Sequence, residues 1–161
     1  MNKVEDLNIP LSKPLYVYQV PMFLITVSTV LVVDNGVVLV EDGNELRFPG
    51  GIVKAQQETI QFAAVRQIKE QTGVMLRKEA LIPVDFRSEP ERSEARNEID
   101  LGFLCVPENI HAELFASRDA SAKWVEVDFE NKILLKEYER FYMDHDVLLE
   151  RAIDILLMMK E

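Results

Sequence analysis

The chain lacks the features that mark secreted, membrane-spanning and metal-clustered proteins. Its single cysteine, Cys105, cannot form an intrachain disulfide, and its two histidines, His111 and His145, show no metal-ligand spacing. The longest apolar stretch, residues 20–33, is interrupted by Pro21 and by hydroxyl side chains, so it is typical of a strand rather than a membrane span. The first ten residues hold no apolar stretch behind a basic cluster. We therefore expect a cytoplasmic protein without a signal peptide.

Positive charge is also scarce. The 161 residues include 28 acidic and 18 basic ones, for a formal net charge of −10. This excess of negative charge argues against nonspecific binding to nucleic acid and against an anionic membrane surface. It permits an anionic small ligand, because arginines can make one site locally positive. At this length, with 48% hydrophobic residues, we expect one domain over residues 1–161, with an irregular arm at 1–15 and a closing helix region at 141–161.

Apolar periodicity predicts mostly strands, with two helices far apart in the chain. Strands are predicted at 22–33, 37–40, 81–86, 99–106 and 123–127, and helices at 58–72 and 147–159. The Asp-Asn-Gly sequence at 34–36 predicts a tight hairpin between the first two strands. Thr59 is the expected cap of the first helix and Gly73 its expected end. This order predicts an α/β (α+β) fold with a mixed sheet.

Several side chains can be assigned to the core or to the surface from the sequence. Phe62 and Ile68 recur at helical spacing, which predicts that both lie on the apolar side of the first helix. Cys105 lies in the apolar run LGFLCV and is expected to be a buried thiol. His111 and His145 are expected to be surface or capping residues.

The segment from Gly50 to Val74 has the most specific chemistry and reads GGIVKAQQETIQFAAVRQIKEQTGV. Its glycines let the backbone turn tightly and approach a ligand closely, which can present a carbonyl group to a metal. On the following helix, Gln67, Glu70 and Gln71 lie at i, i+3 and i+4, so they share one face. Three carboxylates there would hold Mg²⁺, which neutralises a diphosphate. Only Glu70 supplies one.

This segment resembles the signature of the Nudix hydrolases, G-x5-E-x7-R-E-U-x-E-E-x-G-U, in which U is a bulky aliphatic residue. The matching positions are Glu58, Arg66, Ile68, Glu70, Gly73 and Val74. The signature is degenerate, because Gln67 and Gln71 stand where the family has glutamates. One extra residue also lies between Gly51 and Glu58. Trp124 and the valine after it resemble the Trp-Val strand that many Nudix chains carry downstream.

The resemblance implies an α/β/α sandwich around a mixed sheet, a cleft for a small nucleotide-like ligand and, frequently, a homodimer. It also implies a metal-dependent pyrophosphohydrolase, in which Mg²⁺ or Mn²⁺ polarises the diphosphate of a nucleoside diphosphate linked to another moiety. By resemblance, the catalytic positions are Gln67, Glu70 and Gln71, the metal-binding ones Gly50, Gly51 and Glu70, and the structural ones Glu58, Arg66 and Gly73.

The two glutamines change what this site can do. An amide does not titrate in a useful range, so Gln67 cannot act as a general base. At an effective dielectric near 20, a unit charge about 4 Å from a dication contributes roughly 8 kcal/mol before desolvation. The absence of two such charges predicts weak binding of Mg²⁺ or Mn²⁺.

Arginines are the candidate ligand-binding residues outside this segment, because a guanidinium group binds phosphate through paired, charge-assisted hydrogen bonds. They are Arg47, Arg87, Arg92 and Arg96. Arg47 precedes the Pro-Gly-Gly turn and faces either into the cleft or away from it. The other three flank a loop with interleaved glutamates, for which local salt bridges on a solvated loop are the simpler interpretation. Those glutamates, or Asp119 before Trp124, are alternative sources of metal ligands, although Asp119 is more simply interpreted as a solvated loop residue.

Two functions remain open at this stage. The first is a hydrolase of the Nudix kind, which would use Glu70, a glycine carbonyl and a carboxylate from elsewhere. The second is a catalytically weak or inactive Nudix-fold module that binds a nucleotide or related metabolite without cleaving it. The family resemblance favours the first, and the neutral side chains of Gln67 and Gln71 favour the second.

Overall fold

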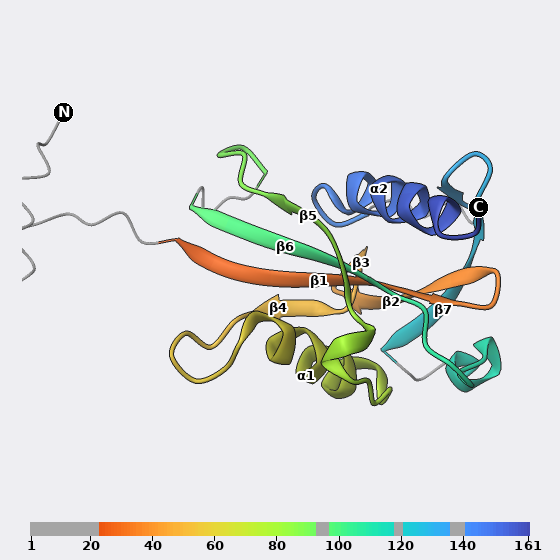
Figure 1. The fold of residues 1–161 in the computed structure, drawn as a ribbon, viewed down its shortest axis with the longest axis horizontal. Helices are drawn as coiled ribbons and strands as arrows, with labels where there is room; N and C mark the ends of the chain where they lie inside the picture. Colours follow the sequence, from red (N-terminus) through yellow and green to blue (C-terminus); the bar gives the residue numbers. More distant parts are fainter. Residues whose placement is uncertain (1–22, 93–96, 118–120, 136–140) are drawn as a thin grey trace, which may run out of the picture.

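The fold is built on one mixed sheet, which the computed structural model describes together with its helices over residues 23–92, 97–117, 121–135 and 141–161 (Figure 1). The strands are β1 (Leu24–Val33), β2 (Gly36–Asp42), β3 (Glu45–Arg47), β4 (Gly50–Ile52), β5 (Ile82–Arg87), β6 (Glu98–Cys105), β7 (Ala122–Asp128) and β8 (Ile133–Leu134). Their order is β5-β6-β1-β2-β7-β8, with β3 paired to β2 and β4 paired to β1. The predicted strands and the hairpin at 34–36 are confirmed.

Strand β1 lies at the centre of the sheet and pairs with three other strands, β2, β4 and β6. One edge pairs in parallel with β6, in a register that places Thr26 beside Asp100 and Ser28 beside Gly102. The other edge is shared, because β4 pairs with residues 26–28 and β2 with residues 31–33, both antiparallel. The mixed sheet is therefore confirmed, and the turn before β4 is brought against the first half of β1.

The two predicted helices cover opposite faces of this sheet (Figure 1). Helix α1 (Ile60–Thr72) begins at the predicted cap, since the Thr59 side chain accepts a hydrogen bond from the Phe62 backbone N–H at 3.2 Å. It ends at Gly73, whose φ of 76° is the left-handed conformation that glycine adopts readily. Helix α2 (His145–Met158) lies on the other face. Short 3₁₀ turns, η3 (Lys78–Ala80) and η4 (Ala112–Phe115), precede β5 and β7.

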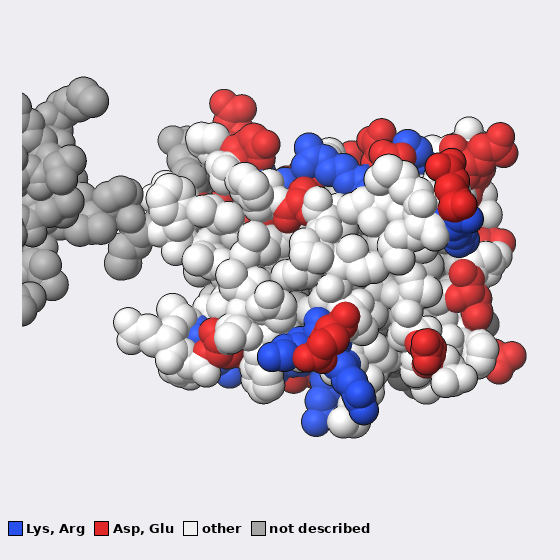
Figure 2. Space-filling view, in the orientation of Figure 1, with Lys and Arg blue, Asp and Glu red and all other residues white. Residues whose placement is uncertain are grey.

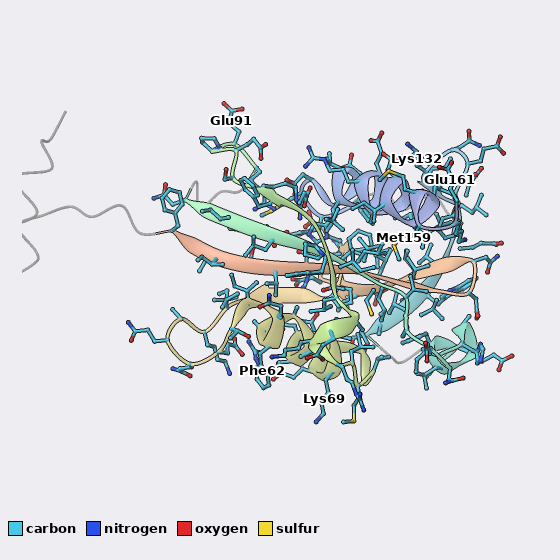
Figure 3. The ribbon with its side chains drawn as sticks, in the orientation of Figure 1. Phe62, Lys69, Glu91, Lys132, Met159 and Glu161 are labelled. Carbon is cyan, nitrogen blue, oxygen red and sulfur yellow. The ribbon has the colours of Figure 1, made fainter. Side chains whose placement is uncertain are left out.

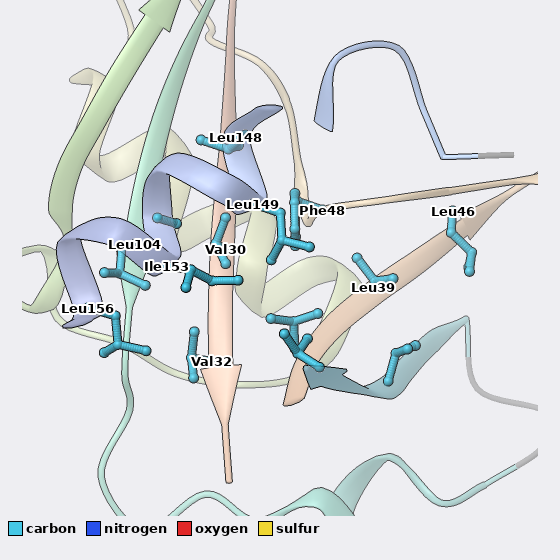
Figure 4. Close-up of a cluster of buried hydrophobic side chains, with 14 residues drawn as sticks. Val30, Val32, Leu39, Leu46, Phe48, Leu104, Leu148, Leu149, Ile153 and Leu156 are labelled. Carbon is cyan, nitrogen blue, oxygen red and sulfur yellow. The ribbon is translucent and has the colours of Figure 1, made fainter. Parts of the chain in front are cut away.

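Alternation along β1 separates the two cores. Val27, Leu31 and Val33 pack with α1 residues such as Ala64 and Ile68. Val30 and Val32 point the other way and pack with residues of α2 (Figure 4). The α2 contribution to this second core consists of Leu148, Leu149, Ala152, Ile153 and Leu156. Because Thr26 and Ser28 have the parity of Val30, they lie on the α2 face as polar positions at one end of an apolar core.

Some predictions about single side chains are confirmed and others are wrong. Cys105 is buried as predicted, and burial raises the pKa of its thiol to about 11. Phe62 is instead 54% exposed and lies on the outer side of α1 (Figure 3), because the small Ala63 and Ala64 make the contact with the sheet. His111 is exposed, but His145 is buried at the start of α2, which corrects the expectation of a surface residue.

Charged side chains lie mainly around the rim of the face drawn in Figure 2, and its centre is uncharged. Among the described residues, no helix is long and apolar enough to cross a membrane. The predicted arm at 1–15, Arg96 and Asp119 lie outside the described residues.

Candidate functional site

A pocket of about 270 Å³ lies against the first half of β1, on the α2 face of the sheet. It lies where β4 and β6 flank β1 and where α2 begins. Its polar lining includes Thr26, Ser28, Arg47, Gly50, Glu98, Asp100, Tyr142 and His145. The structure therefore brings Gly50, Gly51, Arg47 and Arg92 together at one pocket, whereas Glu70 and Arg87 do not line it.

Gln71 pairs with the backbone of Gly50 on both sides of its amide group. The Gln71 Nε2 donates to the Gly50 carbonyl oxygen at 2.7 Å, and the Gly50 N–H donates to Gln71 Oε1 at 2.9 Å. A Cβ on Gly50 would overlap the carbonyl oxygen of Val27, so glycine lets β4 approach β1 this closely. A glutamate at position 71 could accept from the N–H but, as a carboxylate, could not donate to the carbonyl.

Gln67 completes this arrangement. Its Oε1 accepts a second hydrogen bond from Gln71 Nε2, at 2.8 Å, so both N–H groups of the Gln71 amide are used. Gln67 also lies against Gly51, where a Cβ would come within 2.7 Å of Gln67 Nε2. We call Gln67, Gln71 and the Gly50 peptide the amide cluster. It holds the β4 turn on α1 with neutral groups.

Arg47 contacts the amide cluster from the pocket side. Its Nη1 donates to the Gly50 carbonyl oxygen at 3.0 Å, and its Nε donates to Asp42 Oδ2 at 3.1 Å. The Gly50 carbonyl thus accepts from two donors, Gln71 and Arg47. Arg47 is 20% exposed and faces into the pocket, which settles the alternative left by the sequence.

Glu58 and Arg66 form the connection that the resemblance implies between loop and helix. Arg66 binds Glu58 through two hydrogen bonds, of 2.6 and 2.8 Å, and Glu58 also accepts from the Lys54 N–H at 2.8 Å. The hydrogen bonds from Arg66 lower the pKa of Glu58 to about 2. Arg66 also donates to Glu70 at 3.1 Å, and Glu70 is 56% exposed. The carboxylate of Glu70 is thereby directed to Arg66.

The oxygen atoms of this segment do not fit the coordination of a divalent cation. Mg²⁺ takes several oxygen ligands in near-octahedral geometry, most of them charged or water. Here the Gly50 carbonyl is engaged by two hydrogen-bond donors, and one of them, Arg47, is itself a cation. Gln67 and Gln71 are bonded to each other, and Glu70 is paired with Arg66. Among the described residues, no group of three or more His, Cys, Asp or Glu side chains could hold a metal ion.

A second polar network borders the pocket on the α2 side. Arg87, 2% exposed, forms ion pairs with Asp100, with Asp144 at 2.5 Å and with Asp85 at 3.4 Å. Arg92, 3% exposed, binds both carboxylate oxygens of Asp144 at 3.0 Å and Glu98 at 3.0 Å. We call Arg87, Arg92, Asp100 and Asp144 the ionic cluster.

The ionic cluster corrects one expectation. The predicted local salt bridge exists between Arg92 and Glu98, but both arginines are buried rather than solvated. The reason is long-range: Asp144, just before α2, is brought back onto both of them. No local pattern in the sequence indicates this contact, since 52 residues separate Arg92 from Asp144.

Ser28, His145 and Asp100 lie together in a way that superficially resembles a catalytic triad. Ser28 Oγ is 3.3 Å from His145 Nε2 and 3.0 Å from Asp100 Oδ1. However, the Phe48 N–H donates to His145 Nδ1 at 3.0 Å, so a neutral ring carries its proton on Nε2 and donates it to Ser28. Burial lowers the pKa of His145 to about 3, which keeps the ring neutral. His145 therefore cannot accept a proton from Ser28, and its role here is to connect α2 to β1 and to Phe48.

Comparisons with known proteins agree with this fold. The NUDIX domain family model matches residues 22–144. The chain therefore belongs to the Nudix family. Among curated proteins, it is 29% identical over 129 residues to the ADP-ribose pyrophosphatase of Methanocaldococcus jannaschii, over 73% of each chain.

Solved structures share the fold at low sequence identity. A MutT/nudix family protein from Enterococcus faecalis has a TM-score of 0.70 and 20% identity over 89% of this chain, which spans 66% of that protein. The NUDIX domain of Shewanella oneidensis NrtR, solved with ADP ribose, has a TM-score of 0.68 and 17% identity. That match covers 97% of this chain and 99% of the other. The predicted Nudix-type fold is confirmed.

Proposed function

We propose that the pocket binds a nucleoside diphosphate linked to a further group, of the ADP-ribose type, and that it does not cleave this ligand by Mg²⁺-dependent hydrolysis. The observation that carries the proposal is the pairing of Gln71 with Gly50. It engages one of the two glycine carbonyls, Gly50 and Gly51, that the family resemblance offers to a metal, and it does so with an amide that a glutamate could not replace.

The ligand class is supported by the names of relatives. One similar protein is an ADP-ribose pyrophosphatase, and one structure of similar fold contains ADP ribose. The pocket is compatible with such a ligand, because it is lined by the guanidinium group of Arg47, which can bind phosphate, and by the side chain of Tyr142, which can contact the rest of the ligand.

A metal-dependent hydrolase is the second candidate, favoured by the relative's name. It would need carboxylates from outside the Nudix segment. The nearest ones already have partners, because Asp100 accepts from Arg87, Thr26 and Ser28, and Glu98 accepts from Arg92. Recruiting them would require the ionic cluster to open, so we place binding without cleavage first.

Isothermal titration with ADP-ribose tests the proposal, in EDTA and again with Mg²⁺ or Mn²⁺, followed by chromatography of the same samples for AMP and ribose 5-phosphate. We expect binding in EDTA and no metal-dependent cleavage. Tyr142→Ala should weaken binding because Tyr142 lines the pocket, whereas Phe86→Ala, on the exposed side of β5, should not. Turnover that requires metal would reject the proposal in favour of the hydrolase, and absence of any binding would reject both the ligand class and the site.

A further inference from the structure

Three described arginines lie in or beside the pocket, and they differ in how many of their N–H groups are used. Arg92 donates through Nε, Nη1 and Nη2 to Asp144 and Glu98. Arg87 is enclosed by three carboxylates and does not line the pocket. Arg47 donates through Nε and Nη1 only, and in the described part of the chain its Nη2 has no hydrogen-bond partner.

We propose that Arg47 is the anion-binding residue of the pocket and holds the ligand's phosphate in place of a divalent cation. This inference rests on the proposed function. It adds the group that neutralises the ligand and explains how binding can occur without metal. The positive charge belongs to the Arg47 guanidinium group, which is part of the protein and donates a hydrogen bond to the Gly50 carbonyl at 3.0 Å.

The contacts of Arg47 orient its remaining donors. Asp42 holds Nε at 3.1 Å, and the Gly50 carbonyl holds Nη1 at 3.0 Å. A guanidinium group is planar and carries five N–H groups in a fixed fork. Two contacts therefore fix its plane and leave the two N–H groups of Nη2 and one of Nη1 for a ligand. An anion bound there needs no ordering of the arginine side chain, which favours affinity.

The neutral amide cluster suits this role. A glutamate at position 67 or 71 would place a negative charge near the phosphate unless a cation intervened, and a glutamine does not. The pocket's other carboxylates already have cationic neighbours, since Asp100 is paired with Arg87 and Glu98 with Arg92. Asp42 differs from these carboxylates, because its cationic partner is Arg47, the residue proposed to bind the ligand. Its negative charge should therefore oppose anion binding.

The variants that test this inference separate charge from structure. Arg47→Gln removes the charge but keeps an amide that can donate to Gly50. Asp42→Asn removes the negative charge that opposes the ligand but keeps Arg47 and an amide oxygen that can accept from its Nε. Arg77→Ala removes one positive charge from an exposed residue outside the pocket and is the matched control. Titrations in EDTA would use ADP-ribose and inorganic pyrophosphate as probes, at two salt concentrations, with a melting temperature for each variant.

We expect Arg47→Gln to weaken binding of both probes roughly 10- to 100-fold, the range for a lost charged hydrogen bond. Its remaining affinity should also depend less on salt. Asp42→Asn should bind as well as the wild type or up to about fivefold tighter, and Arg77→Ala should be unchanged.

Other outcomes would overturn the inference. Wild-type affinity in Arg47→Gln would show that Arg47 is not the anchor, although the proposed function would stand. Equal losses in Arg47→Gln and Asp42→Asn would show that the ion pair only supports the β2–β3 turn. If the wild type binds only when Mg²⁺ is present, a metal ion rather than Arg47 holds the phosphate. A wild type that binds neither probe under any condition would instead remove the proposed function.

Discussion

Two polar networks border the same pocket, and they are built from opposite chemistry. The amide cluster on the α1 side consists of neutral groups in close hydrogen-bond contact, with Arg47 added at its edge. The ionic cluster on the α2 side consists of buried charges. Neutral hydrogen bonds contribute about 1 kcal/mol each and respond little to pH. Buried ion pairs are strongly destabilising when one partner is lost, because the other remains as an uncompensated charge.

The comparison separates two requirements of the site. The amide cluster occupies the Gly50 carbonyl with a hydrogen-bond donor, which under the proposed function disfavours a metal there. The ionic cluster determines where α2 begins, since Asp144 ties the helix to β5 through Arg87 and to Arg92. We therefore assign ligand chemistry and fold stability to two different networks, each of which reaches the pocket through part of its residues. Substitutions in the two networks should differ in size and in kind.

Arg87→Met should have the largest effect, because it leaves the buried carboxylate of Asp100 without its ion-pair partner and removes one of the two arginines that bind Asp144. We expect a loss of about 3–5 kcal/mol in the free energy of unfolding, measured by urea denaturation. Arg151→Met is the matched control, since Arg151 also pairs with Asp85, at 2.6 Å, but is 49% exposed. It should lose less than about 1 kcal/mol. Similar losses in both variants would show that the ionic cluster contributes no more than a surface ion pair.

The pH dependence of stability should come next in size and should also arise on the α2 side. Burial lowers the pKa of His145 from 6.5 to about 3, so between these values the unfolded chain binds a proton that the folded chain does not. Stability is therefore greatest above pH 6.5 and falls as the pH decreases, by up to about 1.4 kcal/mol per pH unit. Urea denaturation between pH 5 and 6.5 measures this slope.

The two histidines of the chain provide the controls for that slope. His145→Gln should abolish it, and His111→Gln, at an exposed position, should leave it unchanged. Burial also raises the pKa of Asp100, which acts with the opposite sign, so stability falls as the pH rises through that pKa. A slope that persists undiminished in His145→Gln would mean that the ring is not held neutral in the folded protein.

The sequence predicted the features that depend on local chemistry. Thr59 and Gly73 bound α1 because capping and left-handed termination involve residues within one turn, and the hairpin at 34–36 depends on its own turn residues. The link between Glu58 and Arg66, carried by resemblance, is also confirmed.

The remaining features depend on contacts between distant segments. His145 and Arg87 are buried because α2 docks on β1 and β5, and neither position has an apolar neighbourhood that would indicate this. The amide cluster was missed for another reason. In the sequence, a glutamine in place of a glutamate suggests only the loss of a charge. The hydrogen bond that the Gln71 amide donates to Gly50 follows from the fold, which brings together two residues that are 21 positions apart.

Gln71→Glu should have the smallest effect on stability and the clearest dependence on metal. In EDTA the carboxylate would face the Gly50 carbonyl and Gln67 Oε1, which are both acceptors, where the amide now donates at 2.7 and 2.8 Å. We expect a loss of about 1–2 kcal/mol. Millimolar Mg²⁺ should reverse much of it, because a cation can take the place of the lost donor, and Gln67→Glu combined with Gln71→Glu should tighten Mg²⁺ binding further. Thermal unfolding with EDTA or Mg²⁺ measures both effects.

Gln61→Glu adds the same charge to the exposed first turn of α1 and is the control, for which the helix dipole predicts a slight gain and no response to Mg²⁺. The wild type should also be insensitive to Mg²⁺, since its carbonyl already has two donors. Stabilisation of the wild type by Mg²⁺ to the same extent as the variant would show that the amide cluster opens readily. The amide cluster would then be able to bind a metal ion. The two networks would differ in whether a metal is bound rather than in the chemistry of their side chains.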